Sequence, residues 1–194
     1  QGSYSKQQLD WRNVWPLAAN DRRVYAARTN DVIIVDAATG KIEATCPTKY
    51  APHRLVLTGG CVVAACWEKK DFSNWKDGFE GDAIRAVWWP AGEGSVEAFD
   101  AETGKPKWTL PLTALTVVAS EDTVYLLTHK GNPPTERTVV AVDLATGKEK
   151  WRVPHTTFGE EADTCLNFAS PGCAVVSKTK AKGKPGVFVL SAAD

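Results

Sequence analysis

Apolar and polar residues alternate along short stretches of this chain, and one such stretch recurs. Residues 96–108 read VEAFDAETGKPKW, which is an alternating strand, a turn at Glu102-Thr103-Gly104 and a second strand ending in tryptophan. Glycine suits this turn because it adopts a positive φ at no steric cost. The pattern returns as VVAVDLATGKEKW at 139–151, as VIIVDAATGK at 32–41, with Ala44 at the tryptophan position, and as the partial copy VFVLSAAD at 187–194. A hairpin that recurs in this way indicates a repeat protein.

Aligning the copies gives a unit of four short strands, A to D. The strands are rich in valine, alanine, tyrosine and isoleucine and are separated by glycine, asparagine, aspartate and proline. This pattern predicts an all-β chain, and a tandem repeat of four-stranded antiparallel sheets is typical of the blades of a β-propeller. The predicted blades cover residues 14–46, 53–111, 114–154 and 164–194, three of them complete and the last without its outer strand. Residues 1–194 are therefore interpreted as a single, partial β-propeller domain.

The phrase Ala-x-Asp-x-x-Thr-Gly-Lys-x-x-Trp occurs twice and resembles the tryptophan-docking motif of the quinoprotein (PQQ-like) β-propeller repeat family. The resemblance implies that each motif tryptophan packs between its own motif alanine and the turn of the next blade. A buried indole supplies apolar area and an N–H donor, which suits this role. Ala44 in the first copy implies a weaker contact there. The resemblance assigns structural docking roles to Ala98, Gly104, Trp108, Ala141, Gly147 and Trp151.

The N-terminal segment contains a candidate for one further copy. Trp11 precedes Val24 by 13 residues, and Trp108 precedes the equivalent Val124 by 16. Residues 6–11 would be the outer strand of a preceding blade, or a strand that completes the last blade of a closed ring. The resembled family typically has more than four blades, which favours a slice of a larger ring. Open blade faces then predict either closure, with residues 6–11 beside 187–191, or self-association.

The longest insertion separates strands B and C of the second unit. Val62 and Asp100 are 38 positions apart, whereas the equivalent Val24 and Asp36 are 12 apart. Connections this long are often functional, and antiparallel order places this one on the same face as the D–A connections. Its aromatic side chains form either a platform for a ligand or partner, or a second core over the blade tops. The second is preferred because exposed aromatics promote aggregation. Within residues 67–94 they are Trp67, Phe72, Trp75, Phe79, Trp88 and Trp89.

Composition argues against several classes of function. The 23 basic and 23 acidic residues leave no net charge to attract nucleic acid, and no apolar run reaches the roughly 20 residues that cross a bilayer. The odd spacing of Cys61 and Cys66 sends them to opposite faces of one strand, as small buried side chains.

Catalytic and metal-binding patterns are also missing from the sequence. It contains no zinc spacing, nucleophile motif or phosphate loop, so no catalytic or metal residue is assigned. The three histidines stand beside turn residues, which predicts surface or capping roles. The aspartate that precedes each repeated turn is expected to accept backbone N–H groups of that turn. These residues are His53, His129 and His155, and Asp36, Asp100 and Asp143.

The resemblance implies two very different functions. Some members are periplasmic dehydrogenases that hold pyrroloquinoline quinone (PQQ) and calcium and oxidise alcohols or sugars; others are cofactor-free scaffolds, including an outer-membrane assembly lipoprotein. The repeat encodes the blade and not the site, and no residue here matches the cofactor, calcium or catalytic positions. We therefore expect a non-catalytic interaction or scaffold module without a cofactor. It would bind a protein partner or the remainder of the propeller in a periplasmic or otherwise extracytoplasmic bacterial protein. The alternative is a fragment of a PQQ- and calcium-dependent quinoprotein dehydrogenase, so the question of enzyme activity stays open.

Overall fold

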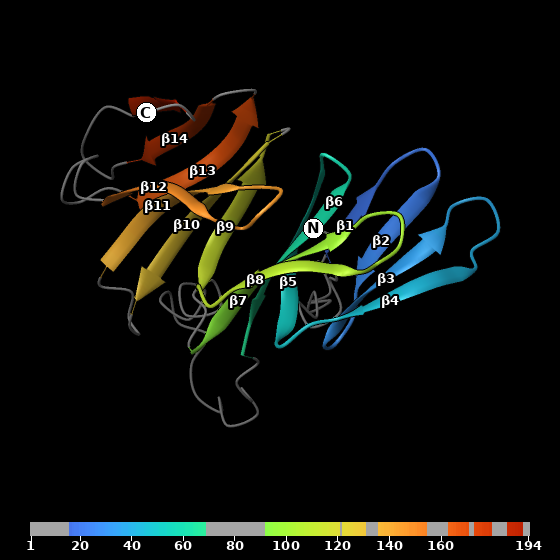
Figure 1. Ribbon diagram of the computed structural model, residues 1–194. Helices are drawn as coiled ribbons and strands as arrows, with labels where there is room; N and C mark the ends of the chain where they lie inside the picture. The colour runs from blue at the N-terminus through green and yellow to red at the C-terminus, as the bar shows by residue number, and fades with distance from the viewer. Residues whose placement is uncertain are drawn as a thin grey trace, which may run out of the picture.

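Four antiparallel sheets follow one another along the chain. The computed structural model describes residues 16–68, 92–120, 122–130 and 136–154, and the strands at 163–170, 173–179 and 186–191. Every regular element in these residues is a β-strand. Three sheets have four strands and one has three, and Figure 1 shows them side by side in chain order, from blue to red. The all-β propeller fold predicted from the repeats is confirmed.

The strand order in each sheet is the order in the sequence, as expected for an up-and-down blade. In the third blade, the two strands of the central hairpin end at Lys130 and begin at Glu136. The first blade contains β1 (Leu17–Ala19), β2 (Arg23–Ala27), β3 (Asp31–Asp36) and β4 (Ile42–Pro47). The second contains β5 (Ala51–Thr58), β6 (Cys61–Trp67), β7 (Gly94–Asp100) and β8 (Pro106–Leu110). The third contains β9 (Ala114–Ala119), β10 (Thr123–Lys130), β11 (Glu136–Asp143) and β12 (Glu149–Pro154), and the last sheet β13 (Asp163–Ser170), β14 (Cys173–Thr179) and β15 (Gly186–Ser191).

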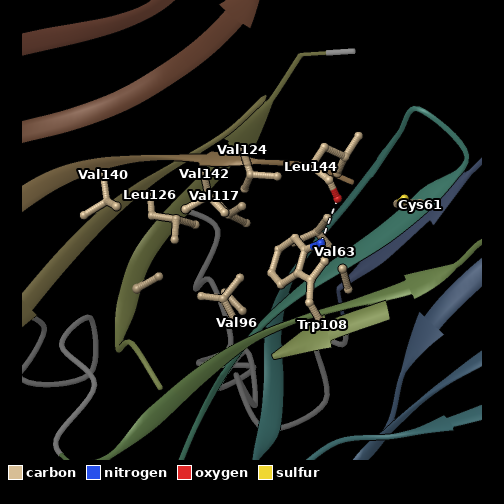
Figure 2. Close-up of a cluster of buried hydrophobic side chains, with 13 residues drawn as sticks. Cys61, Val63, Val96, Trp108, Val117, Val124, Leu126, Val140, Val142 and Leu144 are labelled. Carbon is tan, nitrogen blue, oxygen red and sulfur yellow. Dashed lines mark hydrogen bonds between the residues drawn. The ribbon is translucent and has the colours of Figure 1, made fainter. Parts of the chain in front are cut away.

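Alternation along β6 and β7 buries both faces of the second blade. On one face, Val63 and Ala98 join a core with the third blade; on the other, Val62 and Phe99 join a core with the first. Figure 2 shows the first of these two cores. Cys61 and Cys66 fall into different cores, as their odd spacing predicted. In a stacked blade, the alternation therefore decides which neighbouring blade a side chain meets.

The three C–D turns share one hydrogen-bond pattern. The backbone N–H of Thr39 donates to Asp36 Oδ1 at 2.7 Å, and the equivalent bonds to Asp100 and Asp143 are 2.8 Å long. The threonine hydroxyl also donates to the same oxygen in each turn. These bonds lower the pKa of each aspartate, and the bond from the threonine hydroxyl has the largest effect. The predicted structural role of the repeated aspartates is confirmed.

Several predictions concern residues outside the described part of the chain. They are the strand at 6–11 and its pairing beside β15, five aromatic residues of the insertion, and one histidine. These last six residues are Phe72, Trp75, Phe79, Trp88, Trp89 and His155.

Candidate functional site

Trp108, on the outer strand β8, docks onto the third blade. Its register partner across the hairpin is Ala98, and the small methyl leaves room for the ring. The indole Nε1–H donates a 2.7 Å hydrogen bond to the carbonyl of Leu144, in the turn between β11 and β12 (Figure 2). Gly147 of that turn lies against the ring, because a Cβ there would come within 2.7 Å of Trp108 Cγ. The structure thus brings Ala98, Trp108 and Gly147 together across two blades.

The first and second blades meet through a different set of side chains. Ala44 holds the tryptophan position and pairs with Ile34, so the large and small residues have exchanged places across the hairpin. Cβ of Ala44 lies 3.0 Å from where a Cβ on Gly104 would stand. The hydroxyl of Tyr25 donates a 3.0 Å hydrogen bond to the carbonyl of Ala101, the repeat position of Leu144. The acceptor is therefore kept while the donor has moved from the outer strand to β2.

Replacing Tyr25 with phenylalanine is expected to lower the free energy of unfolding by about 1–2 kcal/mol, because the Ala101 carbonyl then stays buried without a partner. Urea denaturation at neutral pH measures the change. Tyr50→Phe is the matched control. It removes an exposed hydroxyl that donates to Glu93, and it should cost less than about 0.5 kcal/mol. Equal losses in the two variants would contradict the docking role of Tyr25.

Trp151 is the counterpart of Trp108 on the third blade. It pairs with Ala141, and its ring lies 6.0 Å from that of Tyr125 at an angle of 47°. Its Nε1 is buried and has no hydrogen-bond partner among the described residues. The repeat position of the acceptor is Ala192, which lies outside them.

Gly147→Ala is expected to reduce the free energy of unfolding by about 2–3 kcal/mol, through both the strained backbone and the clash with the Trp108 ring. Gly60→Ala separates the two causes. Gly60 has nearly the same φ, +70° against +72°, and nothing lies within 4 Å of its absent Cβ, so about 1 kcal/mol is expected there. Thermal and urea melts of both variants provide the comparison. Losses of the same size would mean that the ring does not restrict position 147.

A pocket of about 450 Å³ opens between the second and third blades. It lies on the face from which the B–C loops and D–A connections leave, which we call the loop face. Its walls mix charged and uncharged groups. The Tyr50 hydroxyl donates to Glu93 at 2.6 Å, and Lys130 pairs with Glu136 at 3.4 Å. The lining residues are Lys49, Tyr50, Gly92, Glu93, Gly94, Pro111, Leu112, Thr113, Thr128, His129, Lys130, Glu136, Thr138 and Arg152.

A buried glutamate holds one wall of this pocket. Glu97 is only 5% exposed, and its Oε1 accepts a 2.6 Å bond from the Ser95 hydroxyl and a 3.0 Å bond from the backbone N–H of Lys49. On the other side, the backbones of Gly94 and Thr113 lie close together. Glycine permits this, because a Cβ on residue 94 would come within 2.9 Å of Thr113 Cα. The pocket walls are therefore fixed by interactions within and between blades.

The cysteine side chains of the described residues lie inside the blades. Cys46, Cys61 and Cys66 are free and buried. Burial raises the pKa of Cys46 to about 11 and raises that of Cys66 further, with a contribution from the charge of Glu97. Because the thiolate is the reactive form, the prediction of small buried side chains agrees with their surroundings.

The surface role predicted for the histidines is wrong for both that the structure describes. His53 occupies a β-bulge in β5 and stacks on Trp67, with the ring centroids 3.9 Å apart and the planes 3° from parallel. His129 is only 7% exposed. The bulge turns a residue beside Pro52 inward, between two sheets. Trp67 therefore packs against the blade, as the second interpretation of the aromatic insertion expected for it.

Tandem four-stranded antiparallel blades, joined by side chains that dock on the turn of the following blade, define this chain as part of a β-propeller. Residues 92–179 match the family model described as outer membrane protein assembly factor BamB. That part of the chain carries PQQ-like propeller repeats, which confirms the resemblance seen in the sequence. No curated protein sequence matches the chain.

Solved structures share the fold at low sequence identity. BamB from Moraxella catarrhalis is 14% identical with a TM-score of 0.54, and the match covers 90% of this chain and 49% of that one. Hydrazine synthase from Kuenenia stuttgartiensis is 11% identical with a TM-score of 0.57, covering 91% and 50%. The Pan2 WD40 domain from Neurospora crassa is 14% identical with a TM-score of 0.52, covering 86% and 48%. This chain thus spans about half the length of each structure.

Two further observations apply to the described residues. No three side chains among their histidines, cysteines, aspartates and glutamates gather as a metal site. No helix in that part of the chain is long and apolar enough to cross a membrane. We assign no reaction step to PQQ or calcium.

Proposed function

We propose that this chain is a non-catalytic propeller module that binds a protein partner on its loop face. The partner contacts the pocket between the second and third blades, and the module is a domain of a larger extracytoplasmic protein. Neither PQQ nor calcium takes part. The family description, an outer membrane assembly factor, supports the extracytoplasmic location and the scaffold role.

The observation that carries this proposal is the pre-organised pocket. Its backbone is held by Glu97 and by the close approach at Gly94, so little conformational entropy is lost when a partner binds. Tyrosine and arginine are enriched at protein interfaces, and Tyr50 and Arg152 both line the pocket. The pocket walls carry both cations and carboxylates. They therefore complement an extended peptide that carries charges of both signs.

Photo-crosslinking at matched positions tests the proposal. A photoreactive phenylalanine analogue replaces either Lys130, which lines the pocket, or Lys148, an exposed lysine of the C–D turn in the same blade. Both variants are made in the full protein in its own cells. We expect one crosslinked product of defined mass from position 130 and none from position 148. The Arg152→Glu change should reduce the amount of that product.

The partner identified in this way is then purified and its affinity is measured. Arg152→Glu should weaken binding about tenfold, the effect of losing one well-placed charge contact, whereas Lys148→Glu should leave it unchanged. Equal crosslinking from both positions, or none from position 130, would contradict the proposal. Stoichiometric binding of added PQQ with calcium, seen as cofactor absorbance on the isolated protein, would support the quinoprotein dehydrogenase instead.

A further inference from the structure

Arg152, on β12, is anchored in the pocket wall by a carboxylate of its own strand. Its Nε–H donates to Glu149 Oε1 at 2.8 Å, and its Nη2–H donates to the other oxygen of the same group. Such a fork fixes the plane of the guanidinium. In the part of the chain that the structure describes, no group accepts a hydrogen bond from Nη1. Because Arg152 lines the pocket, its Nη1 is available to a ligand that enters there.

The first blade shows how an arginine anchored by its own sheet can be used. Arg23 Nε–H donates to Glu43 on β4 of the same blade at 2.6 Å, and its Nη1–H donates to Glu102, in the C–D turn of the second blade. One guanidinium thus holds a carboxylate of its own sheet and a second carboxylate from outside that sheet, which its five N–H donors permit. Arg152 has a contact of the first kind and, among the described residues, none of the second kind.

The other charged groups of the pocket favour an anion as the ligand of Arg152. Its two carboxylates are already engaged. Glu93 accepts a hydrogen bond from the Tyr50 hydroxyl, and Glu136 pairs with Lys130. Lys49, in contrast, forms no ion pair with a described residue, and its Nζ lies 4.9 Å from the centroid of the Tyr50 ring. The contacts that remain for a ligand are therefore mainly those of cations.

We propose that the partner places an aspartate or glutamate side chain in this pocket, where its carboxylate accepts hydrogen bonds from Arg152 Nη1. This inference rests on the proposed function and adds the chemical identity of one contact. Hydrogen bonds between two charged groups are the stronger kind. Because Glu149 already orients the guanidinium, little side-chain entropy is lost when the second carboxylate binds.

Arg28 provides a matched control. Its Nε–H and Nη2–H donate to the two carboxylate oxygens of Asp31, both at 2.7 Å. Its side chain is 48% exposed, against 51% for Arg152, but it does not line the pocket. Surface ion pairs contribute little to stability, so Arg28→Gln and Arg152→Gln should leave the urea midpoint nearly unchanged. A loss of binding in only one of the two variants then reports a lost contact with the partner.

A double-mutant cycle across the interface tests the proposal. The probe is a synthetic peptide, amidated at its C-terminus, that covers the partner segment crosslinked at position 130. Fluorescence anisotropy measures its affinity for the full protein, with each aspartate or glutamate of the peptide replaced in turn by asparagine or glutamine. One of these replacements should weaken binding about tenfold, as should Arg152→Gln, because each removes a charged hydrogen bond. Combining the two should add less than about twofold, since both remove the same contact.

The control variant has the opposite expectation. Arg28→Gln should bind the unchanged peptide as the wild type does, and the peptide replacement should keep its full effect there. Losses that multiply at every acidic position of the peptide would overturn the inference, as would a segment without an acidic residue, or binding that requires a free C-terminal carboxylate. In these cases the crosslink still supports the proposed function. Absence of the crosslink at position 130 would overturn the function and the inference together.

Discussion

Replacing Trp108 with alanine is expected to lower the free energy of unfolding by about 3–5 kcal/mol, the usual cost of removing a buried aromatic side chain. The ring is only 9% exposed and belongs to the core between the second and third blades. The change leaves a cavity against Gly147 and also leaves the Leu144 carbonyl without its 2.7 Å donor. Urea denaturation followed by circular dichroism measures the loss.

Two companion variants divide this effect into its parts. Trp108→Phe keeps most of the apolar area but removes the N–H. Its free energy of unfolding should therefore lie between those of the wild type and Trp108→Ala. Asp36→Ala removes hydrogen bonds from an exposed turn and should cost about 1 kcal/mol. If Asp36→Ala were more damaging than Trp108→Ala, the indole would not be the main contact between these blades.

Acid is expected to destabilise the chain through His53 at pH values where carboxylates are still ionised. Burial, followed by the charge of Arg54, lowers the pKa of His53 from 6.5 to about 3. Both ring nitrogens are buried without a hydrogen bond of normal geometry among the described residues, and backbone groups near the ring oppose the shift only weakly. The neutral form is therefore strongly preferred in the folded state.

The sign of the pH dependence follows from this preference. The unfolded chain takes up a proton at His53 below pH 6.5, whereas the folded chain does not until about pH 3. Stability from this group is complete above pH 6.5 and is lost as the pH falls, by about 1.4 kcal/mol per unit, or about 2 kcal/mol by pH 5. Urea midpoints at intervals between pH 7.5 and 4.5 measure it.

The third blade provides the control for this prediction. Leu115 occupies the equivalent β-bulge in β9, so His53→Leu introduces a side chain that this position already accepts elsewhere in the chain. In that variant, the loss between pH 6.5 and 5 should disappear. If His53→Leu kept the acid sensitivity, another titrating group would be its cause.

The features that could be predicted from the sequence are those encoded by neighbouring residues. The Asp-x-x-Thr-Gly turn forms its hydrogen bonds within five residues, and the strands on each side alternate regularly. Their repetition was enough to predict four antiparallel sheets. The docking of Trp108 followed from a family resemblance, because no local pattern shows that Leu144 is its acceptor.

Other features depend on residues far apart in the chain. The acceptor of Tyr25 lies 76 residues away, and in β2 the tyrosine looks like any other core residue. Glu97 alternates with apolar neighbours, which normally indicates a solvent-facing position. A blade in a stack has neighbours on both faces, so this residue meets the first blade and not water. His53 points inward because it occupies a β-bulge. In the sequence, the adjacent proline indicated a surface turn at this position.

In the second blade the small Ala98 pairs with the large Trp108, whereas in the first blade the large Ile34 pairs with the small Ala44. This exchange has a practical consequence for recognising such blades. The receiving side of each contact needs a glycine with positive φ and an unoccupied carbonyl, and few substitutions satisfy both conditions. The donating side needs only sufficient volume and one polar hydrogen, which Tyr25 supplies from a different strand. The donating residues of a repeat can therefore diverge together while the blades stay joined. A count of blades based on tryptophan would omit β1 to β4, whereas a count based on the turn would include them.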